Sequence, residues 1–348
     1  MSSLFHSSIL TNSGCFVCLN FWYHYSEPLL RPNLIAETIE RLNQRYYGPR
    51  IKYQVQTNGT LFTDYAIELI KKYKIDVGIS IDGYKCINDC TRIYPDGSSS
   101  YESVEKGMKK LYENNILFGV LFLITKHNVN HLTDILDWCK DVGIDRIGFN
   151  TFTPLGYGKE EDLAPDINEL TQNVIKEIDW LIEYNQKEIN TTRKFIYERE
   201  IESYVVRILN PEKCAHMCTD IPCGAGKYHL SVDVDGKINI CDCFYGMDDF
   251  VIGNINTQSL DEILQNPLVQ EFNGRTIDKL EGCQNCDNHI CHGGCPSHNV
   301  LFLNSKDGLY KKSYKCNYYN TIYKYLIQKL ENEHVNPALL AEMYLEVK

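Results

Sequence analysis

The residues of this sequence best suited to chemistry are its cysteines. Ten of the fifteen cysteines lie between residues 214 and 316 of the 348-residue chain. Eight thiolates make two complete four-cysteine sites, and such soft ligands prefer zinc or iron–sulfur clusters. The densest stretch has the spacing Cys-x2-Cys-x4-Cys-x3-Cys, which predicts a metal-binding module. The eight predicted ligands are Cys218, Cys223, Cys241, Cys283, Cys286, Cys291, Cys295 and Cys316.

The kind of metal stays open from spacing alone. Two zinc sites of the ribbon type would use the same cysteines. Buried thiols without a metal are disfavoured, because packing preference does not produce so dense a run of cysteines. His289, His292 and His298 lie among the cysteines and could replace one of them as a ligand. With enough thiols present, we expect these histidines to lie around the metal sites or at the surface.

The elements that must position such sites alternate along the first 155 residues. Apolar runs predict strands, and apolar residues at helical spacing between them predict helices. Regular alternation implies right-handed crossovers and a parallel sheet, and hence an α/β domain or barrel. The predicted strands are 15–25, 51–57, 75–81, 117–125 and 145–151, and the predicted helices are 32–46, 64–73, 101–114 and 130–142.

Polar loops follow the predicted strands, at Ser26-Glu27-Pro28, Asn58-Gly59-Thr60 and Asp82-Gly83. In parallel α/β folds the carboxyl ends of the strands form the functional rim, so a site is expected there. Residues 166–209 predict a helical connector. Further on, residues 232–240 predict a β-hairpin that turns at Asp-Gly. A helix is predicted at residues 259–265, and a helical tail from about residue 318.

Composition limits the possible partners. Lys and Arg total 35 against 46 Asp and Glu, giving a net charge of −11 and a pI near 5.4. We therefore expect no nucleic-acid partner, and the one basic run, 311–315, predicts a solvated turn. No apolar stretch could span a bilayer, and the first fourteen residues carry no Lys or Arg. A cytoplasmic location follows, where cysteines serve as metal ligands more often than as disulfides.

The order of cysteines resembles the SPASM domain of radical S-adenosylmethionine enzymes, although four residues rather than five precede the third cysteine of the dense run. The upstream segment agrees independently. Residues 26–30, Ser-Glu-Pro-Leu-Leu, stand where the family has Gly-Gly-Glu-Pro-Leu. Residues 56–61 and 78–83 are similar to the family's third and fourth strands. The chain is most similar to anaerobic sulfatase-maturating enzymes and related peptide maturases.

The resemblance implies two auxiliary 4Fe-4S clusters and S-adenosylmethionine as cofactors. The first cluster would use Cys218, Cys223, Cys241 and Cys295, and the second Cys283, Cys286, Cys291 and Cys316. Cys214 and Cys243 are then spare, although Cys214 could replace Cys218. Asp242 matches the aspartate proposed as the base that deprotonates the substrate. Glu27 would contact the amino group of S-adenosylmethionine, and Ser80 and Arg92 its carboxylate or ribose side.

The sequence departs from the family in its first segment. The family's Cys-x3-Cys-x2-Cys loop is absent, and before Ser26 only Cys15 and Cys18 occur. Two thiols cannot hold the catalytic cluster, so the chain is expected not to cleave S-adenosylmethionine reductively. We expect the family's first strand to be missing and a sheet edge to be exposed. The chain is then either an incomplete copy of an enzyme or a degenerate relative.

These inferences define an expected architecture. The fold class is α/β, with a partial (β/α)6 TIM-like radical S-adenosylmethionine barrel and a small cysteine-rich iron–sulfur SPASM domain. The expected boundaries are 1–160 for the barrel, 161–212 for the connector, 213–320 for the SPASM domain and 321–348 for the tail.

The resemblance implies post-translational modification of a peptide or protein, either sulfatase-maturase-like oxidation or peptide maturation. A reductant such as flavodoxin or ferredoxin would serve as partner, and no membrane is expected. The alternative is a non-catalytic module that binds peptide and holds iron–sulfur clusters or zinc.

Overall fold

The structure is a computed structural model that describes residues 6–11, 18–24, 27–45, 50–155, 158, 162–211 and 223–345. The chain divides into two compact units. The first comprises residues 1–81, 92–118 and 224–274, and the second comprises residues 82–91, 119–223 and 275–348. These units interleave along the sequence, and the domain boundaries expected above stay predictions.

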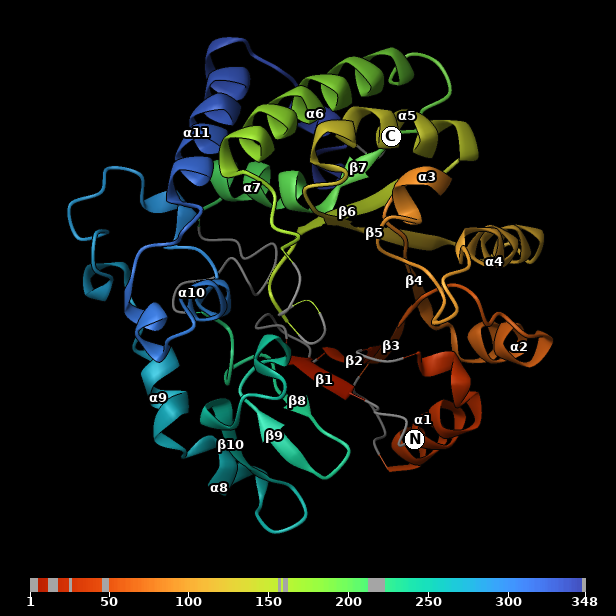
Figure 1. The fold of residues 1–348 in the computed structure, drawn as a ribbon, viewed down its shortest axis with the longest axis vertical. Helices are drawn as coiled ribbons and strands as arrows, with labels where there is room; N and C mark the ends of the chain where they lie inside the picture. The colour runs from red at the N-terminus through yellow and green to blue at the C-terminus, as the bar shows by residue number, and fades with distance from the viewer. Residues whose placement is uncertain are drawn as a thin grey trace. The chain divides into compact units, whose positions relative to one another are not determined.

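The first unit contains a mixed sheet (Figure 1). Its parallel part is β2 (Cys18–His24), β3 (Arg50–Thr57) and β4 (Asp76–Ser80). The antiparallel part is β1 (His6–Thr11), β8 (Ser231–Val232), β9 (Lys237–Asn239) and β10 (Val251–Asn254). The strand order is β10-β9-β8-β1-β2-β3-β4.

Strand β1 corrects the expectation of an exposed edge. It pairs antiparallel with β2, from His6 opposite His24 to Thr11 opposite Leu19. On its other side it pairs with β8. An antiparallel strand does not replace a parallel first strand of the family, but it satisfies the backbone groups that β2 would otherwise present to solvent.

Three helices of the first unit are α1 (Pro32–Arg45), α2 (Asp64–Tyr73) and α4 (Tyr101–Glu113). Helix α2 begins where the Thr63 hydroxyl accepts from the amide of Ala66 at 3.2 Å. Helix α4 contacts the turn after β3 closely. A Cβ at Gly107 would lie 2.0 Å from the carbonyl oxygen of Gly59, so only glycine fits there. This contact fixes the loop at the end of β3.

Two short helices complete the first unit, α8 (Leu260–Leu264) and α9 (Pro267–Asn273). Helix α8 starts with a capping box between Ser259 and Glu262. The predicted hairpin is confirmed as β8 and β9. At its turn the amide of Gly236 donates to the carbonyl of Asp233 at 3.0 Å, and Gly236 has φ +83°.

The second unit contains the parallel strands β5 (Phe118–Ile124), β6 (Arg146–Thr151) and β7 (Tyr197–Glu198). Helices α6 (Ile167–Glu188) and α7 (Arg199–Leu209) fall in the predicted connector. Helix α11 (Cys316–Ile327) contacts both of them, and it lies beside them in Figure 1. The remaining α-helices are α3 (Lys85–Asn88), α5 (Leu132–Val142) and α10 (Pro296–Leu303).

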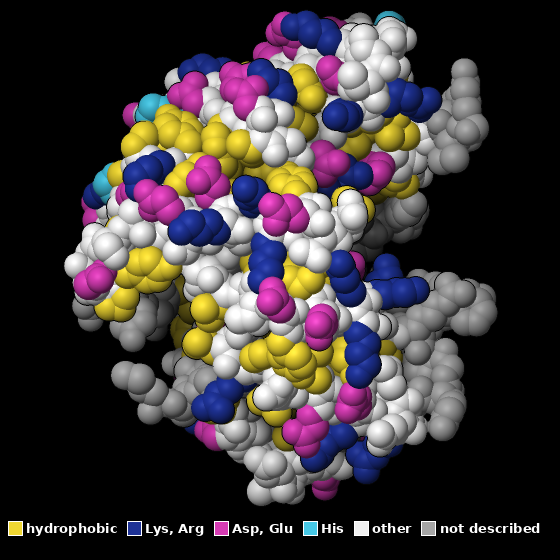
Figure 2. All heavy atoms as spheres, turned by 90° about the vertical axis from the view of Figure 1, so that its right-hand side faces the viewer, with side chains coloured by type: hydrophobic (Ala, Val, Ile, Leu, Met, Phe, Trp, Pro, Cys, Tyr) yellow, Lys and Arg dark blue, Asp and Glu magenta, His cyan; other side chains and the backbone are white. Residues whose placement is uncertain are grey.

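The α/β class and the strand–helix alternation are confirmed, and most predicted elements lie within three residues of the observed ones. On the face drawn in Figure 2, lysine and arginine side chains lie among aspartates and glutamates, so that opposite charges partly offset one another. Among the described residues no helix is both long and apolar enough to cross a membrane.

The basic run 311–315 is only partly a solvated turn. Lys311 and Lys312 are exposed. Ser313 is buried, and Lys315 is 2% exposed, so the sequence expectation is wrong for this end of the run. Lys315 ends beneath the rings of Tyr314 and Tyr318, with its Nζ 5.9 and 5.8 Å from their centroids. These aromatic faces contribute cation–π attraction to a buried ammonium.

Candidate functional site

Glu27 lies at the rim of the first unit, where β3 ends. It caps the short helix Pro28–Leu30, and its Oε1 accepts from the amide of Leu29 at 3.0 Å. Oε1 also accepts from the hydroxyl of Thr57 at 2.7 Å, and Oε2 accepts from the amide of Asn58 at 2.8 Å. A carboxylate has about four acceptor positions. Three donors therefore orient this carboxylate and leave acceptor capacity on Oε2.

Burial and hydrogen bonding act on Glu27 in opposite directions. Burial raises the pKa of Glu27, and the hydrogen bonds from Thr57, Asn58 and Leu29 partly counteract this. Desolvation disfavours the carboxylate, whereas donors to it favour it. A cationic group next to Oε2 would complete the stabilisation of the charged form.

Ser80 ends β4 and is positioned by a neighbour on β3. The side-chain amide of Gln56 donates to the Ser80 hydroxyl at 2.8 Å. This contact depends on Gly78, because a Cβ there would lie 2.1 Å from Gln56 Oε1. Glu27 follows β2 and Ser80 ends β4, and residues 56 and 57 of β3, the strand between these two, hold both side chains. The sequence motif included Gln56 and Thr57, but no role was predicted for either.

Arg92 is half-buried in the loop before α4, and its carbonyl oxygen accepts from the hydroxyl of Ser100 at 2.7 Å. This bond fixes the backbone of the loop. The role expected for the Arg92 side chain stays a prediction.

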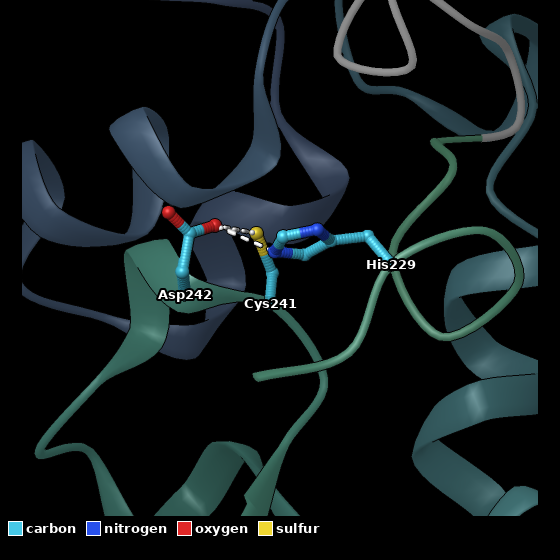
Figure 3. Close-up of side chains that lie close together, drawn as sticks. All are labelled: His229, Cys241 and Asp242. Atoms are coloured by element: carbon cyan, nitrogen blue, oxygen red, sulfur yellow. Dashed lines mark hydrogen bonds and ion pairs between the residues drawn. The ribbon is translucent and has the colours of Figure 1, made fainter. Parts of the chain in front are cut away.

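Asp242 belongs to a compact group with His229 and Cys241, also in the first unit (Figure 3). His229 Nε2 lies 2.9 Å from Asp242 Oδ1, and the Cys241 thiol donates to the same oxygen at 3.1 Å. His229 is buried, with 3% of its side chain exposed, and Asp242 is partly exposed at 18%. The carboxylate is therefore oriented by two groups. Sequence reasoning missed His229, because a single histidine carries no spacing signal.

The four cysteines predicted to form the second site line one cavity in the second unit. Cys283, Cys286, Cys291 and Cys316 face it together with Gly293 and five other residues. Burial raises the pKa of the Cys283 and Cys291 thiols, and the neighbouring cysteines raise it further. A cationic group between these sulfurs would offset both effects and favour the thiolates.

In the described residues, the one set of three ligand atoms within 4.8 Å of one another is His229, Cys241 and Asp242. The choice between zinc and an iron–sulfur cluster at the cavity cysteines stays a prediction.

The first predicted set is described only in part. Cys218 lies outside the described residues, as does the spare Cys214. Cys241 belongs to the first unit, and Cys223 and Cys295 belong to the second. Cys223 and Cys241 are buried. Cys295 precedes α10, and its sulfur lies 3.0 Å from the hydroxyl of Ser297. The spare Cys243 is half-buried and free.

The histidines among the cysteines have other neighbours. His292 Nε2 lies 3.1 Å from Nη1 of the buried Arg207. The ring of His298 stands edge-on to Tyr314, with their centroids 6.5 Å apart. The structure describes no side chain for His289. The expectation that these histidines are not ligands stays a prediction.

Comparison with protein families identifies two domains. Residues 18–139 match the model of the radical SAM superfamily, and residues 223–287 match that of SPASM, an iron–sulfur cluster-binding domain. The chain therefore combines a radical S-adenosylmethionine domain with a SPASM domain. Domains of these kinds imply 4Fe-4S clusters and S-adenosylmethionine as cofactors.

Curated relatives include an uncharacterized protein of Methanocaldococcus jannaschii, 37% identical over 148 residues, which are 42% of this chain and 50% of that protein. This chain thus spans about half the length of that relative. The cysteine-type anaerobic sulfatase-maturating enzyme of Clostridium perfringens is 24% identical over 323 residues, 90% of this chain and 82% of the enzyme. The serine-type enzyme of Klebsiella aerogenes is 23% identical over 80% of this chain and 67% of the enzyme.

Solved structures show the same fold. The native enzyme anSMEcpe with bound AdoMet and Cp18Cys peptide superposes with a TM-score of 0.77, at 22% identity, over 90% of this chain and 85% of the other. SuiB of Streptococcus suis bound to S-adenosylmethionine superposes with a TM-score of 0.59, at 19% identity, over 86% of this chain and 66% of the other. The chain thus shares the fold of these proteins, and its residues 18–139 and 223–287 match radical SAM and SPASM domains.

Proposed function

We propose that the family function of this protein is the modification of a peptide or protein side chain, and that the chain binds S-adenosylmethionine at the ends of β3 and β4 and holds two auxiliary 4Fe-4S clusters in its cysteine module. The observation that carries the proposal is the cavity lined by the four cysteines of the predicted second set. The relatives named as anaerobic sulfatase-maturating enzymes support the maturation chemistry.

The residues at the rim would bind and orient the cofactor. Glu27 Oε2 would accept from the amino group of S-adenosylmethionine, and Ser80 and Arg92 would contact its carboxylate or ribose side. Gln56 and Thr57 would hold the first two side chains in place. When bound, the cofactor of this family supplies a carbon radical that abstracts hydrogen from the substrate.

The cysteines would hold the clusters in two sets. The first set would be Cys218, Cys223, Cys241 and Cys295, and the second Cys283, Cys286, Cys291 and Cys316. Asp242 would take a proton from the substrate, with its carboxylate oriented by the bond to His229 at 2.9 Å. A structural neighbour with a bound peptide supports a peptide substrate. We further propose flavodoxin or ferredoxin as the source of electrons.

A second candidate function rests on the first segment. Up to Ser26 the sequence offers only Cys15 and Cys18, whereas the catalytic cluster of the family needs three thiolates. Cys18 begins strand β2, and Cys15 lies outside the described residues. The alternative is a degenerate relative that keeps the auxiliary clusters and binds peptide without radical chemistry.

Anaerobic reconstitution of the 348-residue chain with iron, sulfide and S-adenosylmethionine tests both parts. We expect a brown protein that contains iron–sulfur clusters and yields no 5′-deoxyadenosine under reduction, because two thiolates cannot replace three. Chromatographic detection of 5′-deoxyadenosine would contradict the second expectation. A colourless protein that contains zinc would contradict the first. An upstream DNA segment encoding Cys-x3-Cys-x2-Cys would favour the enzyme over the degenerate relative.

A further inference from the structure

Arg275 is a buried cation for which the proposed function provides no role. Its side chain is 3% exposed, in the segment that leads from α9 to the cysteine-rich loop. Nε donates to the carbonyl of Leu309 at 2.8 Å. Nη2 is buried and has no hydrogen-bond partner within the described part of the chain. A guanidinium stays charged in proteins, and a buried charge without a counter-charge is strongly destabilising.

The groups that interact with Arg275 are cysteines. Burial lowers the pKa of Arg275, and the thiols of Cys223, Cys295 and Cys283 counteract this. Arg275 in turn lowers the pKa of the Cys283 thiol, whereas burial raises it. All four residues belong to the second unit. The guanidinium and these sulfurs therefore lie within electrostatic reach of one another.

These three cysteines come from both predicted ligand sets. Cys223 and Cys295 belong to the first set, and Cys283 belongs to the second. Gly293 lines the cavity of the second set and lies beside the Arg275 guanidinium. A Cβ at Gly293 would lie 2.3 Å from Leu280 Cδ1 and 3.7 Å from Arg275 Nη2.

We infer that Arg275 is a counter-charge for the cavity lined by Cys283, Cys286, Cys291 and Cys316 and raises the reduction potential of the group that it holds. The inference rests on the proposed function. Adding an electron to a cluster held by four thiolates makes its charge more negative, and a fixed positive charge nearby stabilises that reduced state. Arginine suits this role because it keeps its charge when buried and presents several donors in one plane. Arg275 is in this sense a positioning and tuning residue.

The test is a spectroelectrochemical titration of the anaerobically reconstituted full chain. Arg275→Met removes the charge and keeps much of the stem, and Arg275→Lys keeps the charge. Ile322→Ala, a truncation of a fully buried residue on α11, controls for general loosening of the second unit. We expect Arg275→Met to move the midpoint potential of the cluster in this cavity to more negative values, and the other two variants to stay close to the wild type. Iron and sulfide analysis accompanies each titration.

If Arg275→Met fails to retain clusters, retention by Arg275→Lys would equally support a requirement for the charge. The inference is overturned if Arg275→Met titrates like the wild type, or if Arg275→Lys shares its shift or its loss of iron. A wild-type protein without iron would overturn the proposed function itself. If the wild type contains its full complement of iron and Arg275→Met has unchanged midpoint potentials, only the inference is overturned.

Discussion

At the scale of single residues, Glu27 shows how one carboxylate can be prepared for a cationic ligand. It is more than half-buried, three donors fix its direction, and burial still raises its pKa. An ammonium at the remaining acceptor position would favour the charged carboxylate. Two of these three donors come from the end of β3 and the residue after it, and they explain why a carboxylate is accommodated at this position.

Glu27→Gln should weaken the binding of S-adenosylmethionine. Losing a charge-assisted hydrogen bond costs about 1.5–3 kcal/mol, which corresponds to about 10-fold to 150-fold in affinity. Isothermal titration calorimetry on anaerobic protein measures this directly. Thr57→Val, which removes one donor to Glu27 but keeps its charge, should have a smaller effect. Equal affinity in Glu27→Gln and the wild type would exclude Glu27 from the site.

The sequence was informative about residues that form short motifs and uninformative about isolated partners. Glu27 and Ser80 could be proposed as cofactor-binding residues because each stands in a run of residues similar to a motif of the family. His229 could not, because it reaches Asp242 through the fold of the hairpin region rather than through a fixed spacing. Arg275 gave no signal for the same reason. Its burial and its unpaired Nη2 become visible only in three dimensions.

At the scale of elements, helices α6 and α7 bury two acids close to each other. Glu198 caps α7, and its Oε2 accepts from the amide of Ile201 at 2.7 Å. Burial and then the charge of Glu200 raise the pKa of Glu198 to about 7. Glu177 on α6 is 1% exposed, and its Oε1 has no hydrogen-bond partner within the described ranges. Burial, and then the charges of Glu198 and Glu200, raise the pKa of Glu177 well above its usual range.

These acids should make the second unit less stable as the pH rises. Because each pKa is raised on folding, the stabilisation is complete below the unfolded value near 4.5 and is lost as the pH passes the folded value. For Glu198 the loss amounts to about 3 kcal/mol, completed as the pH rises through about 7. Glu177→Gln removes one of the two contributions, so it should be more stable than the wild type at pH 9.

Urea denaturation at pH 6 and pH 9, followed by circular dichroism, gives the free energies of unfolding. Glu183→Gln changes an exposed glutamate of the same helix and should follow the wild type at both values. A wild-type stability that rises between pH 6 and pH 9, or a Glu177→Gln variant that loses stability as steeply as the wild type, would contradict this assignment.

Elements with strong periodicity or turn chemistry were predictable, and short polar ones were not. Helix α2 was predicted with its observed bounds from the spacing of its apolar residues, and in the structure Thr63 caps it. The Asp-Gly turn likewise identified the hairpin of β8 and β9. Strand β1 was missed, since its sequence HSSILT shows neither alternation nor a continuous apolar run. Strand β7 has only two residues, too few for any pattern.

At the scale of the whole molecule, the sequence predicted the order of the two kinds of domain, and their limits stay predictions. Cysteine spacing and the loop motifs gave a radical S-adenosylmethionine segment followed by a SPASM segment, as the family comparison confirms. The compact units of the structure interleave along the chain. Spacing along a chain cannot show this, because tertiary contacts join segments that are distant in sequence.

The central claim is that the cysteine module holds two four-cysteine iron–sulfur clusters. The most direct measurement is iron, sulfide and zinc analysis of the anaerobically reconstituted chain beside two variants. We predict about eight irons and eight sulfides in the wild type, because each cluster contains four of each. The variant Cys291→Ser/Cys316→Ser should fall to about four of each, whereas Cys243→Ser, at the spare cysteine, should match the wild type. Two zinc ions and no sulfide, or an equal loss of iron in both variants, would contradict the account.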